Sequence, residues 1–237
     1  NGAKVFAPAQ LDSLLTALHL YEDAMVEGKL QRLPQLANTL HQKTLFLEQE
    51  IEKERKEPVD ALIAKKDGTV DKRKGFLGQW QTAFLGDYLV AYDGVRTYKQ
   101  STALISFTDG VDVFVDTSTT VIIRESHRDR LYQSMKKDIA LVNGSVLARM
   151  EEKAKEKNDL HLQTNDAESS VKSGLFWANV ENKNKSRLSN YDGTIAVTAQ
   201  NQQVQLGRNE GTIVLKGKPP MVPIPLLPAP QLPWRKP

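Results

Sequence analysis

The sequence contains no cysteine among its 237 residues, and this absence excludes disulfide bonds, thiolate catalysis and metal sites with cysteine ligands. It also lacks any run of about 18 apolar residues, so we expect no helix of this sequence to span a membrane. Histidine is scarce as well, and none of the short spacings typical of zinc ligands occurs among His19, His41, His127 and His161. The sequence therefore nominates no metal site, and His19 and His41 fit the surface of helices.

Neither sign of charge dominates the composition. Lysine and arginine number 32 against 29 aspartates and glutamates, which gives a formal net charge of +3. An excess this small does not predict nucleic acid or an anionic membrane as a partner. Hydrophobic residues make up 40% and charged residues 26% of the chain, as in soluble globular proteins. The length suits one large domain, or one domain with an appendage.

Residues 1–60 are expected to form a hairpin of two antiparallel helices. Between residues 10 and 57 the only glycine is Gly28, and apolar residues recur at helical spacing in two stripes: Leu11, Leu14, Leu15, Leu18, Tyr21 and Met25, then Leu33, Leu36, Ala37, Leu40, Leu47 and Ile51. Gly28 suits the end of the first helix, Pro34 the first turn of the second, and Pro58 its termination. Such a hairpin cannot bury both faces alone, so we expect it to pack on the rest of the chain, on a second copy or on a partner.

Residues 64–217 have the pattern of an all-β domain. Short β-branched runs alternate with dipeptides that favour hairpin turns, namely Asp67-Gly68, Asp93-Gly94, Asp109-Gly110, Asn143-Gly144 and Asp192-Gly193. Polar residues alternate with two inward-facing series, Ala103, Ile105 and Phe107, then Val111, Val113 and Val115. Similar alternation recurs at 146–150, 160–162, 195–197, 204–206 and 213–214. Strands spaced about ten residues apart predict a β-sandwich or a β-solenoid, interrupted by a charged surface loop or short helix at 150–158.

Proline is nearly absent until the end of the chain, where residues 218–237 form a proline-rich segment. Eight of the 11 prolines lie between Pro219 and Pro237. Such a segment favours the polyproline II conformation and acts as a semi-rigid spacer, so we expect it to lead into a further domain. Trp234 has no core of its own there, and we expect it to pack on the β domain or on that neighbour.

An ordered set of motifs along residues 67–220 resembles the FecR-like domain family. Each motif is common by itself, but the family has them in this order: Asp67-Gly68-Thr69-Val70, Gly78-Gln79-Trp80-Gln81, Leu85-Gly86-Asp87-Tyr88-Leu89, Asp93-Gly94-Val95-Arg96-Thr97, Ser101-Thr102-Ala103, Phe107-Thr108-Asp109-Gly110, residues 117–123, Leu141-Val142-Asn143-Gly144-Ser145-Val146, Tyr191-Asp192-Gly193-Thr194-Ile195-Ala196-Val197, and Val204-Gln205-Leu206 followed by Gly211 and Gly217-Lys218-Pro219-Pro220. One motif departs from the family. Residues 163–167 keep its first part, but the arginine and threonine expected before Phe176 are absent while Gly174 and Phe176 remain. A role that relies on that arginine is therefore not carried over.

The resemblance implies an extracytoplasmic β-rich domain without enzymatic activity. The best-known members are inner-membrane sigma regulators whose periplasmic part binds the signalling domain of an outer-membrane transporter, and others are stand-alone envelope proteins. With no membrane span in the sequence, we expect a stand-alone binding or scaffolding module of the bacterial cell envelope. The alternative is a periplasmic component of a FecR-type signal-transduction system. We expect an envelope protein, or peptidoglycan or another cell-wall polymer, as partner, together with self-association through the helical hairpin.

Several residue groups resemble catalytic or metal sites but fit simpler explanations. The triplet His127-Arg128-Asp129 resembles a kinase catalytic loop, yet Ser134 stands where that loop requires asparagine. Ser126 and His127 are neighbours on a strand and should face opposite ways, which is unsuitable for a nucleophile and its base. Asp109, Asp112 and Asp116 lack the spacing of a calcium loop and fit turn and solvent-face positions.

Two tryptophans and three basic clusters complete the candidates. Trp80 and Trp177 fit core positions of a β domain better than a stacking platform for a ligand. The basic clusters at 65–66, 72–74 and 128–137 contain or adjoin acids and fit solvated faces, with a weak contact to an anionic envelope polymer as the alternative. An enzyme requires polar residues that converge in a pocket, and the sequence nominates none. We therefore assign no catalytic, cofactor-binding or metal-binding residue.

Overall fold

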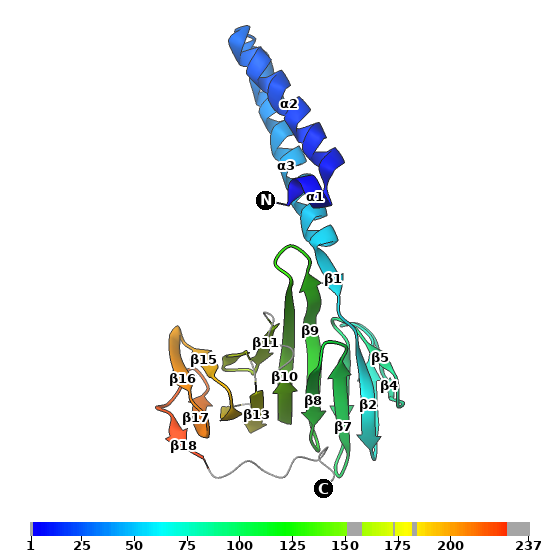
Figure 1. The fold of residues 1–237 in the computed structure, drawn as a ribbon, viewed down its shortest axis with the longest axis vertical. Helices are drawn as coiled ribbons and strands as arrows, with labels where there is room; N and C mark the ends of the chain where they lie inside the picture. Colours follow the sequence, from blue (N-terminus) through cyan, green and yellow to red (C-terminus); the bar gives the residue numbers. More distant parts are fainter. Residues whose placement is uncertain (1, 151–157, 173, 182–183, 227–237) are drawn as a thin grey trace. The chain divides into compact units, whose positions relative to one another are not determined.

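A computed structural model describes residues 2–150, 158–172, 174–181 and 184–226 (Figure 1). The chain divides into two compact units, which are treated separately below. The helical unit comprises Asn1–Glu57 with Asp129–Tyr132, and the β unit comprises Pro58–Arg128 with Gln133–Pro237. Within the described residues, no helix combines the length and apolar character that a membrane crossing requires.

The helical unit contains the two predicted helices in a hairpin. Its elements are α1 (Ala3–Phe6), α2 (Pro8–Val26), the 3-10 turn η1 (Leu30–Arg32) and α3 (Leu33–Arg55). Gly28 ends α2 as expected, with φ of +68° and a pair of closing hydrogen bonds: Gly28 N–H donates to Met25 and Lys29 N–H donates to Ala24. This is the Schellman arrangement, in which a left-handed glycine lets the last carbonyls find donors. The prediction of an N-terminal helical region is confirmed.

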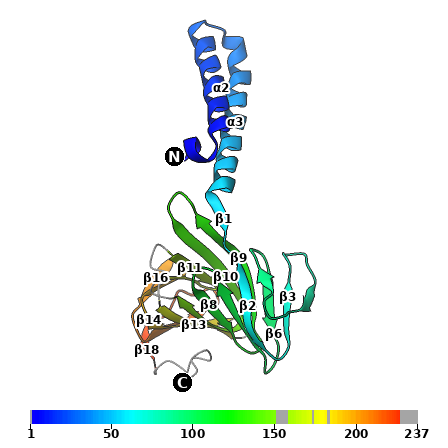
Figure 2. The ribbon, with the colours of Figure 1, turned by 45° about the vertical axis from the view of Figure 1, so that its right-hand side comes forward.

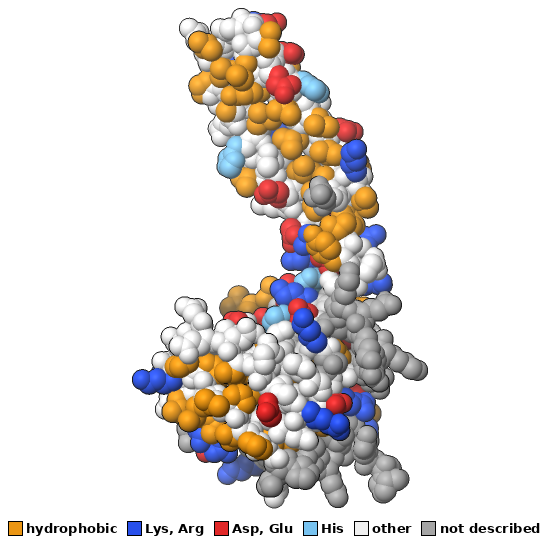
Figure 3. Space-filling model, turned by 60° about the vertical axis from the view of Figure 1, so that its left-hand side comes forward, with side chains coloured by type: hydrophobic (Ala, Val, Ile, Leu, Met, Phe, Trp, Pro, Cys, Tyr) orange, Lys and Arg blue, Asp and Glu red, His pale blue; other side chains and the backbone are white. Residues whose placement is uncertain are grey.

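Small residues allow the two helices to pack together. Ala17 and Ala24 of α2 and Leu47 of α3 are the buried apolar residues of these two helices. Much of the predicted apolar stripe is exposed instead, including Leu15, Leu18 and Met25, and Figure 3 shows hydrophobic side chains over both helices. The hairpin thus buries one narrow seam and leaves a second apolar face without cover in this unit.

Residues 129–132 belong with the helices because they bind the end of α3. Arg130 N–H donates to the carbonyl of Arg55 at 2.9 Å, and the Arg55 guanidinium lies 3.1 Å from the Asp129 carboxylate. Asp129 also accepts hydrogen bonds from the amides of Leu131 and Tyr132. The aspartate of the His127-Arg128-Asp129 triplet therefore organises a turn.

Two sheets make up the β unit (Figure 2). In the first, sheet A, neighbouring strands follow the order β4 (Trp80–Thr82), β3 (Val70–Arg73), β6 (Gly94–Thr97), β9 (Thr120–Asp129), β10 (Ser134–Met150), β11 (Asn158–Gln163), β12 (Glu168–Val171), β15 (Ile195–Ala199) and β16 (Gln202–Leu206). In sheet B the order is β5 (Tyr88–Leu89), β2 (Ala61–Asp67), β7 (Thr102–Phe107), β8 (Val111–Val115), β10, β13 (Gly174–Glu181), β14 (Lys185–Asp192), β17 (Glu210–Leu215) and β18 (Ile224–Pro225). The short strand β1 (Lys56–Pro58) lies where the chain passes from the helical residues to the β residues.

The long strand β10 belongs to both sheets. Its first half pairs in parallel with β11 in sheet A, and its second half pairs antiparallel with β8 and β13 in sheet B. Gly144 lies at the start of the second half with φ of +87°, and a Cβ there would lie 2.7 Å from the Cα of Thr119. The prediction of a hairpin turn at Asn143-Gly144 is therefore wrong: the glycine's conformational freedom redirects one continuous strand.

The other glycine dipeptides also differ from the prediction, except one. Asp109-Gly110 forms the β7–β8 hairpin turn, with φ of +89° at Gly110. Asp67-Gly68 and Asp192-Gly193 connect strands of different sheets, and Gly94 of Asp93-Gly94 is the first residue of β6. A glycine with positive φ serves a sheet-to-sheet connection as well as a hairpin, so the dipeptide alone does not define the pairing.

One apolar core involves inward residues of both sheets. The predicted series around the β7–β8 turn is buried, and the predicted strands at 146–150, 160–162, 195–197, 204–206 and 213–214 are present. Both sheets supply buried members to the core, among them Val70, Val95, Ile123, Leu160 and Ile195 from sheet A and Ile63, Ile105, Val113, Phe176, Leu188 and Val214 from sheet B. The fold class, mainly β with an N-terminal helical region, is confirmed. The β-solenoid alternative stays a prediction, and residues 151–157 and Trp234 lie outside the described residues.

Candidate protein-binding surface

Two neighbouring loops and the short strand β5 display large apolar side chains at the surface of the β unit. Their exposed members, named here the aromatic edge, are Phe76, Leu77, Phe84, Leu85, Tyr88 and Tyr92. Leu77 is 100% exposed, although the domain has a large core in which such side chains are normally buried. A group of exposed apolar residues of this kind is typical of a surface that another protein covers.

The first loop is the β3–β4 connection, which carries Phe76 and Leu77. Gly78 is required there because a Cβ at this position would overlap the carbonyl oxygen of Lys74. The ring of Phe76 packs against the ring of Tyr92, with 4.8 Å between the ring centroids. The loop is therefore attached to the segment that precedes β6.

Asp93 fixes that attachment. Its side chain is 2% exposed and accepts hydrogen bonds from the amides of Gly75 at 3.0 Å and Val90 at 3.1 Å. The Lys74 ammonium lies 3.2 Å from the same carboxylate. One buried carboxylate thus joins the β3–β4 loop to the residues after β5. This role replaces the predicted hairpin turn at Asp93-Gly94.

Asp87 holds the second loop, which carries Phe84 and Leu85. It accepts a 2.7 Å hydrogen bond from the amide of Phe84 and pairs with the Lys72 ammonium at 2.5 Å. Burial alone would raise the pKa of Asp87, but the hydrogen bonds from Lys72 and Phe84 outweigh it and lower the pKa below the ordinary value. Both loops are therefore held by aspartate carboxylates, the first by Asp93 and the second by Asp87.

The aromatic edge adjoins the open edges of both sheets. Among the described strands, β4 pairs only with β3 and β5 pairs only with β2. Figure 2 shows β3 and β6 at one side of the β unit. Unpaired strand edges offer main-chain donors and acceptors to an added strand, and apolar side chains beside them supply contact area.

A cluster of cations and aromatic rings lies on the outer face of sheet A. Trp80 is half-buried there, with the guanidiniums of Arg96 and Arg73 at 4.6 and 5.2 Å from its ring. Gly94 makes room for the indole, since a Cβ would lie 3.0 Å from Cη2 of Trp80. The prediction that Trp80 is a core residue is wrong, because its strand parity directs it away from the core.

The same cluster contains a network of three polar side chains. Arg96 donates to Asp71 at 2.7 Å and to the Tyr98 hydroxyl at 2.6 Å, and that hydroxyl donates to Asp71 at 2.8 Å. Burial raises the pKa of Asp71, but these hydrogen bonds outweigh it and lower the pKa overall. The hydrogen bond to Asp71 raises the pKa of Tyr98. The network holds Arg96 against Trp80.

Trp177 is also on an outer face, that of sheet B. Its neighbours Phe176 and Ala178 are fully buried in the core, so Trp177 between them faces outward and is half-buried. The prediction of a core position is wrong for this residue too. The alternation along β13 could have predicted this, because the apolar residues Phe176, Ala178 and Val180 share one face of the strand and Trp177 lies on the other.

The three aspartates considered as a calcium loop, Asp109, Asp112 and Asp116, bind different partners and do not converge on one site. Asp109 pairs with Lys137, a residue of the cluster predicted to be solvated that is only 1% exposed. Asp112 accepts hydrogen bonds from Ser106 at 2.6 Å and Arg149 at 2.7 Å, and Asp116 accepts one from the amide of Thr117. The prediction of a solvated position is wrong for Lys137, and Asp109, although at a turn, is almost fully buried.

The remaining candidates are dispersed. Ser126 donates to the carbonyl of Val59 at 2.7 Å, while the His127 ring lies 3.3 Å from the Glu125 carboxylate. Both residues are buried on strand β9. His19 is exposed on α2, 3.5 Å from Glu22. In the part of the chain that the structure describes, no group of three or more His, Cys, Asp and Glu side chains is arranged to hold a metal ion.

Part of this sequence matches the model of a known protein family. Residues 93–196 match the model of the family described as FecR protein, a range that runs from the residue before β6 into β15. The aromatic edge and the similar motifs at 67–89 lie outside the matched range. No relative was found among the curated proteins.

Two solved structures align with this chain over part of its length. Both are crystal structures of candidate anti-sigma factors from Parabacteroides distasonis, at 15% and 14% sequence identity with TM-scores of 0.46 and 0.47. Each alignment covers 56% of this chain and 59% of the other, so the chain spans about three fifths of those proteins. The family match is the informative result: residues 93–196 are similar to the family described as FecR protein.

Proposed function

We propose that this chain is a non-enzymatic binding module of the bacterial cell envelope, located outside the cytoplasm, and that it binds another protein through the aromatic edge. The observation that carries the proposal is the group of exposed apolar side chains beside two open strand edges. The match of residues 93–196 to the FecR family supports the envelope location, because resemblance to this family implies an extracytoplasmic role.

The composition of the aromatic edge suits a protein partner. Phenylalanine and tyrosine are enriched where proteins meet, and burying one such side chain yields about 1.5–3 kcal/mol. Four of the six members are aromatic, so a partner that covers them gains several anchors of the kind that dominate binding.

Rigid loops make the same surface favourable for binding. Asp93 and Asp87 already hold the loops through their carboxylates, so a partner does not have to order them. Fixing a side chain or loop on binding costs about 0.5–1.5 kcal/mol per mobile side chain, and this arrangement avoids part of that cost. We infer that the preferred partner presents an extended apolar segment, which also pairs with the open edge of β4 or β5.

A regulatory role is the second candidate, and the FecR match at residues 93–196 favours it. In that case the chain is the extracytoplasmic part of a signal-transduction system, and its partner is a receptor domain. The gene sequence distinguishes the two candidates, because a membrane span followed on the cytoplasmic side by a helical segment supports the regulator over the scaffold.

Site-specific photo-crosslinking tests the proposed surface. A benzophenone amino acid replaces Leu77 or Phe84 in the full chain, and the exposed Arg208 serves as the control position. We expect a discrete protein adduct in the envelope fraction from Leu77 and Phe84 but not from Arg208. Adducts of equal yield at all three positions would refute the surface, and adducts with cell-wall fragments alone would favour the polymer as partner.

A substitution tests whether binding requires ordered loops in addition to the apolar residues of the aromatic edge. Asp93→Asn keeps every residue of the aromatic edge but weakens the link between Lys74, Gly75 and Val90. We expect the crosslink from Leu77 to fall by about tenfold if loop order matters. The matched control is Asp112→Asn, which removes a carboxylate of sheet B that contacts Ser106 and Arg149.

A further inference from the structure

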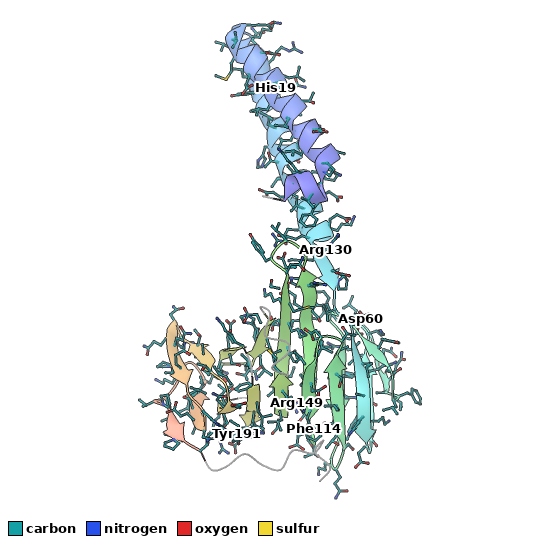
Figure 4. All side chains as sticks on the ribbon, viewed as in Figure 1. His19, Asp60, Phe114, Arg130, Arg149 and Tyr191 are labelled. Carbon is teal, nitrogen blue, oxygen red and sulfur yellow. The ribbon has the colours of Figure 1, made fainter. Side chains whose placement is uncertain are left out.

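A groove of about 330 Å³ opens on the outer face of sheet B, across strands β2, β7 and β8. Figure 4 labels Phe114, one of its lining residues, on β8. The groove shares no residue with the aromatic edge, so it is a second site, independent of the surface proposed for a protein partner. Its lining includes Lys65, Lys66, Asp67, Thr102, Leu104 and Phe114.

Two apolar side chains form the floor of the groove. Leu104 of β7 lies opposite Phe114 of β8 in the strand register. Their chain neighbours Ile105 and Val113 are buried in the core, so Leu104 and Phe114 point to the outer face. One aliphatic and one aromatic side chain at the floor suit an apolar group of a ligand.

A β-bulge directs Lys65 to this floor. Ile63 of β2 pairs with Ile105 of β7. The next pair joins Lys65 to Leu104, so one residue of β2 is left over between the two pairs. Without that extra residue Lys65 would share the inward face of Ile63, and the bulge moves it to the outer face. Bulges are frequent beside functional sites because they redirect a side chain in this way.

Three polar side chains at the groove are available to a ligand. In the part of the chain that the structure describes, the side chains of Lys65, Asp67 and Thr102 make no hydrogen bond or ion pair. Lys66 differs, since its ammonium donates to the carbonyl of Ala83 at 2.8 Å. Lys65 and Asp67 are two residues apart on one strand, a spacing of about 6.6 Å, and Asp67 lies opposite Thr102. The groove therefore offers one positive charge, one negative charge and one hydroxyl beside an apolar floor.

Opposite charges this close together favour a ligand that carries both. A simple carboxylate would be attracted by Lys65 but repelled by Asp67, and a simple amine would meet the reverse. The end of a peptide carries only one of the two charges. A free α-amino acid carries an ammonium group and a carboxylate on one carbon atom, together with a side chain. The groove volume is near the lower end of the range for ligand pockets, about 300–1,000 Å³, and so suits a molecule of this size.

We propose that this groove binds a free α-amino acid with an apolar side chain. Lys65 pairs with the ligand carboxylate, Asp67 accepts hydrogen bonds from its ammonium group, and the Thr102 hydroxyl donates to the carboxylate. The ligand side chain packs on Leu104 and Phe114. Lys65 and Asp67 are exposed, so each charge contributes modestly, and we expect a dissociation constant of about 0.1–1 mM.

Two-dimensional NMR of the full chain tests the site, with L-phenylalanine as the probe. We expect saturable shifts of the amide signals of Lys65, Thr102, Leu104 and Phe114. Glycine has both charges but no side chain, so at the same concentrations it should cause much smaller shifts. The absence of saturable shifts at these amides up to about 20 mM L-phenylalanine would overturn the proposal, as would saturable shifts confined to other parts of the chain.

Paired changes of ligand and residue then assign the two charges. Lys65→Gln should weaken the binding of L-phenylalanine about three- to fivefold but should not weaken that of phenethylamine, which lacks the carboxylate. Asp67→Asn should weaken L-phenylalanine by the same factor but should not weaken 3-phenylpropionate, which lacks the ammonium group. The control Lys216→Gln removes an exposed lysine outside the groove and should leave all three affinities unchanged. Binding of either single-charge ligand as tight as that of L-phenylalanine would overturn the assignment of an amino acid.

Discussion

The ion pair between Lys137 and Asp109 gives the sharpest energetic prediction for the β unit. Lys137 shares its face of β10 with Ile139 and Leu141, both buried in the core, and is itself only 1% exposed. Its ammonium contacts the Asp109 carboxylate and lies 5.5 Å from the centre of the Phe107 ring. In the described residues, Oδ1 of Asp109 has no hydrogen-bond partner. The pair is therefore buried with few compensating contacts.

Asp109→Asn removes one charge and keeps the turn. Asparagine followed by Gly110 favours the same hairpin geometry as aspartate, so the change acts mainly on Lys137. An ammonium left buried without its counter-ion costs about 3–5 kcal/mol of unfolding free energy. The control Asp112→Asn breaks the more exposed pair with Arg149, for which we expect about 0–1 kcal/mol.

A double substitution should reverse the whole loss of stability. Lys137→Met with Asp109→Asn removes both charges and leaves a side chain of similar length beside Ile139. Apolar replacements of buried ion pairs are often neutral or stabilising by about 1–4 kcal/mol. We therefore expect the double variant to be at least as stable as the wild type and far more stable than Asp109→Asn alone.

Urea unfolding, followed by tryptophan fluorescence, measures these differences, and its pH dependence adds a second check. Burial lowers the pKa of Lys137 below its ordinary value of 10.5, more than the Asp109 hydrogen bond raises it. Between the folded value and 10.5 the unfolded chain binds more protons, so this lysine makes stability rise with pH. Lys137→Met should abolish that rise. A cost below about 1 kcal/mol for Asp109→Asn, equal to the Asp112→Asn control, would refute a buried pair.

Three further predictions concern acid stability, a backbone constraint and assembly. The pKa of Asp87 is lowered in the folded state, so its contribution to the free energy of unfolding is present above about pH 3.9 and is lost as the pH falls through the folded pKa. Asp87→Asn should therefore make the urea midpoint depend less on pH below about pH 5. Gly144→Ala should lower the free energy of unfolding by about 2–4 kcal/mol, because the new Cβ meets Thr119 and the residue must keep positive φ. Leu18→Lys on the exposed stripe of α2 should convert a concentration-dependent dimer into a monomer in analytical ultracentrifugation, since we expect the helical hairpin to pair with a second copy.

Each of these has a matched control. For the first prediction the control is Asp60→Asn, which also removes one carboxylate from the β unit. Identical acid profiles for Asp60→Asn and Asp87→Asn would contradict the prediction. Gly110→Ala probes a positive φ with open space around it, so it should cost less than Gly144→Ala. A wild-type monomer at all concentrations would contradict the third prediction, and Thr16→Lys on an exposed polar position controls for added charge.

Much of the β unit was predictable from alternation along the sequence. Ala103, Ile105 and Phe107 are inward because each is apolar and its neighbours include polar residues, which is a local signal. The partners of the strands were not predictable in this way. Gly144 and Gly110 carry almost the same φ, yet one redirects a strand between sheets and the other closes a hairpin. Only the surrounding tertiary contacts distinguish the two uses.

The errors over Trp177 and Lys137 have a common physical cause. Residue type argued for a buried tryptophan and a solvated lysine, but strand parity decides which face a side chain occupies. Trp177 alternates with Phe176 and faces outward, while Lys137 has the parity of Ile139 and faces inward. In both cases the parity of the neighbours carried the correct signal.

The aromatic edge was missed for a different reason. Its apolar pairs, Phe76-Leu77 and Phe84-Leu85, stand beside Gly75, Gly78 and Gly86. Apolar pairs next to turn glycines are a readable sign of side chains displayed on loops. The roles of Asp87 and Asp93 were not readable, because they depend on which backbone amides the fold brings to each carboxylate.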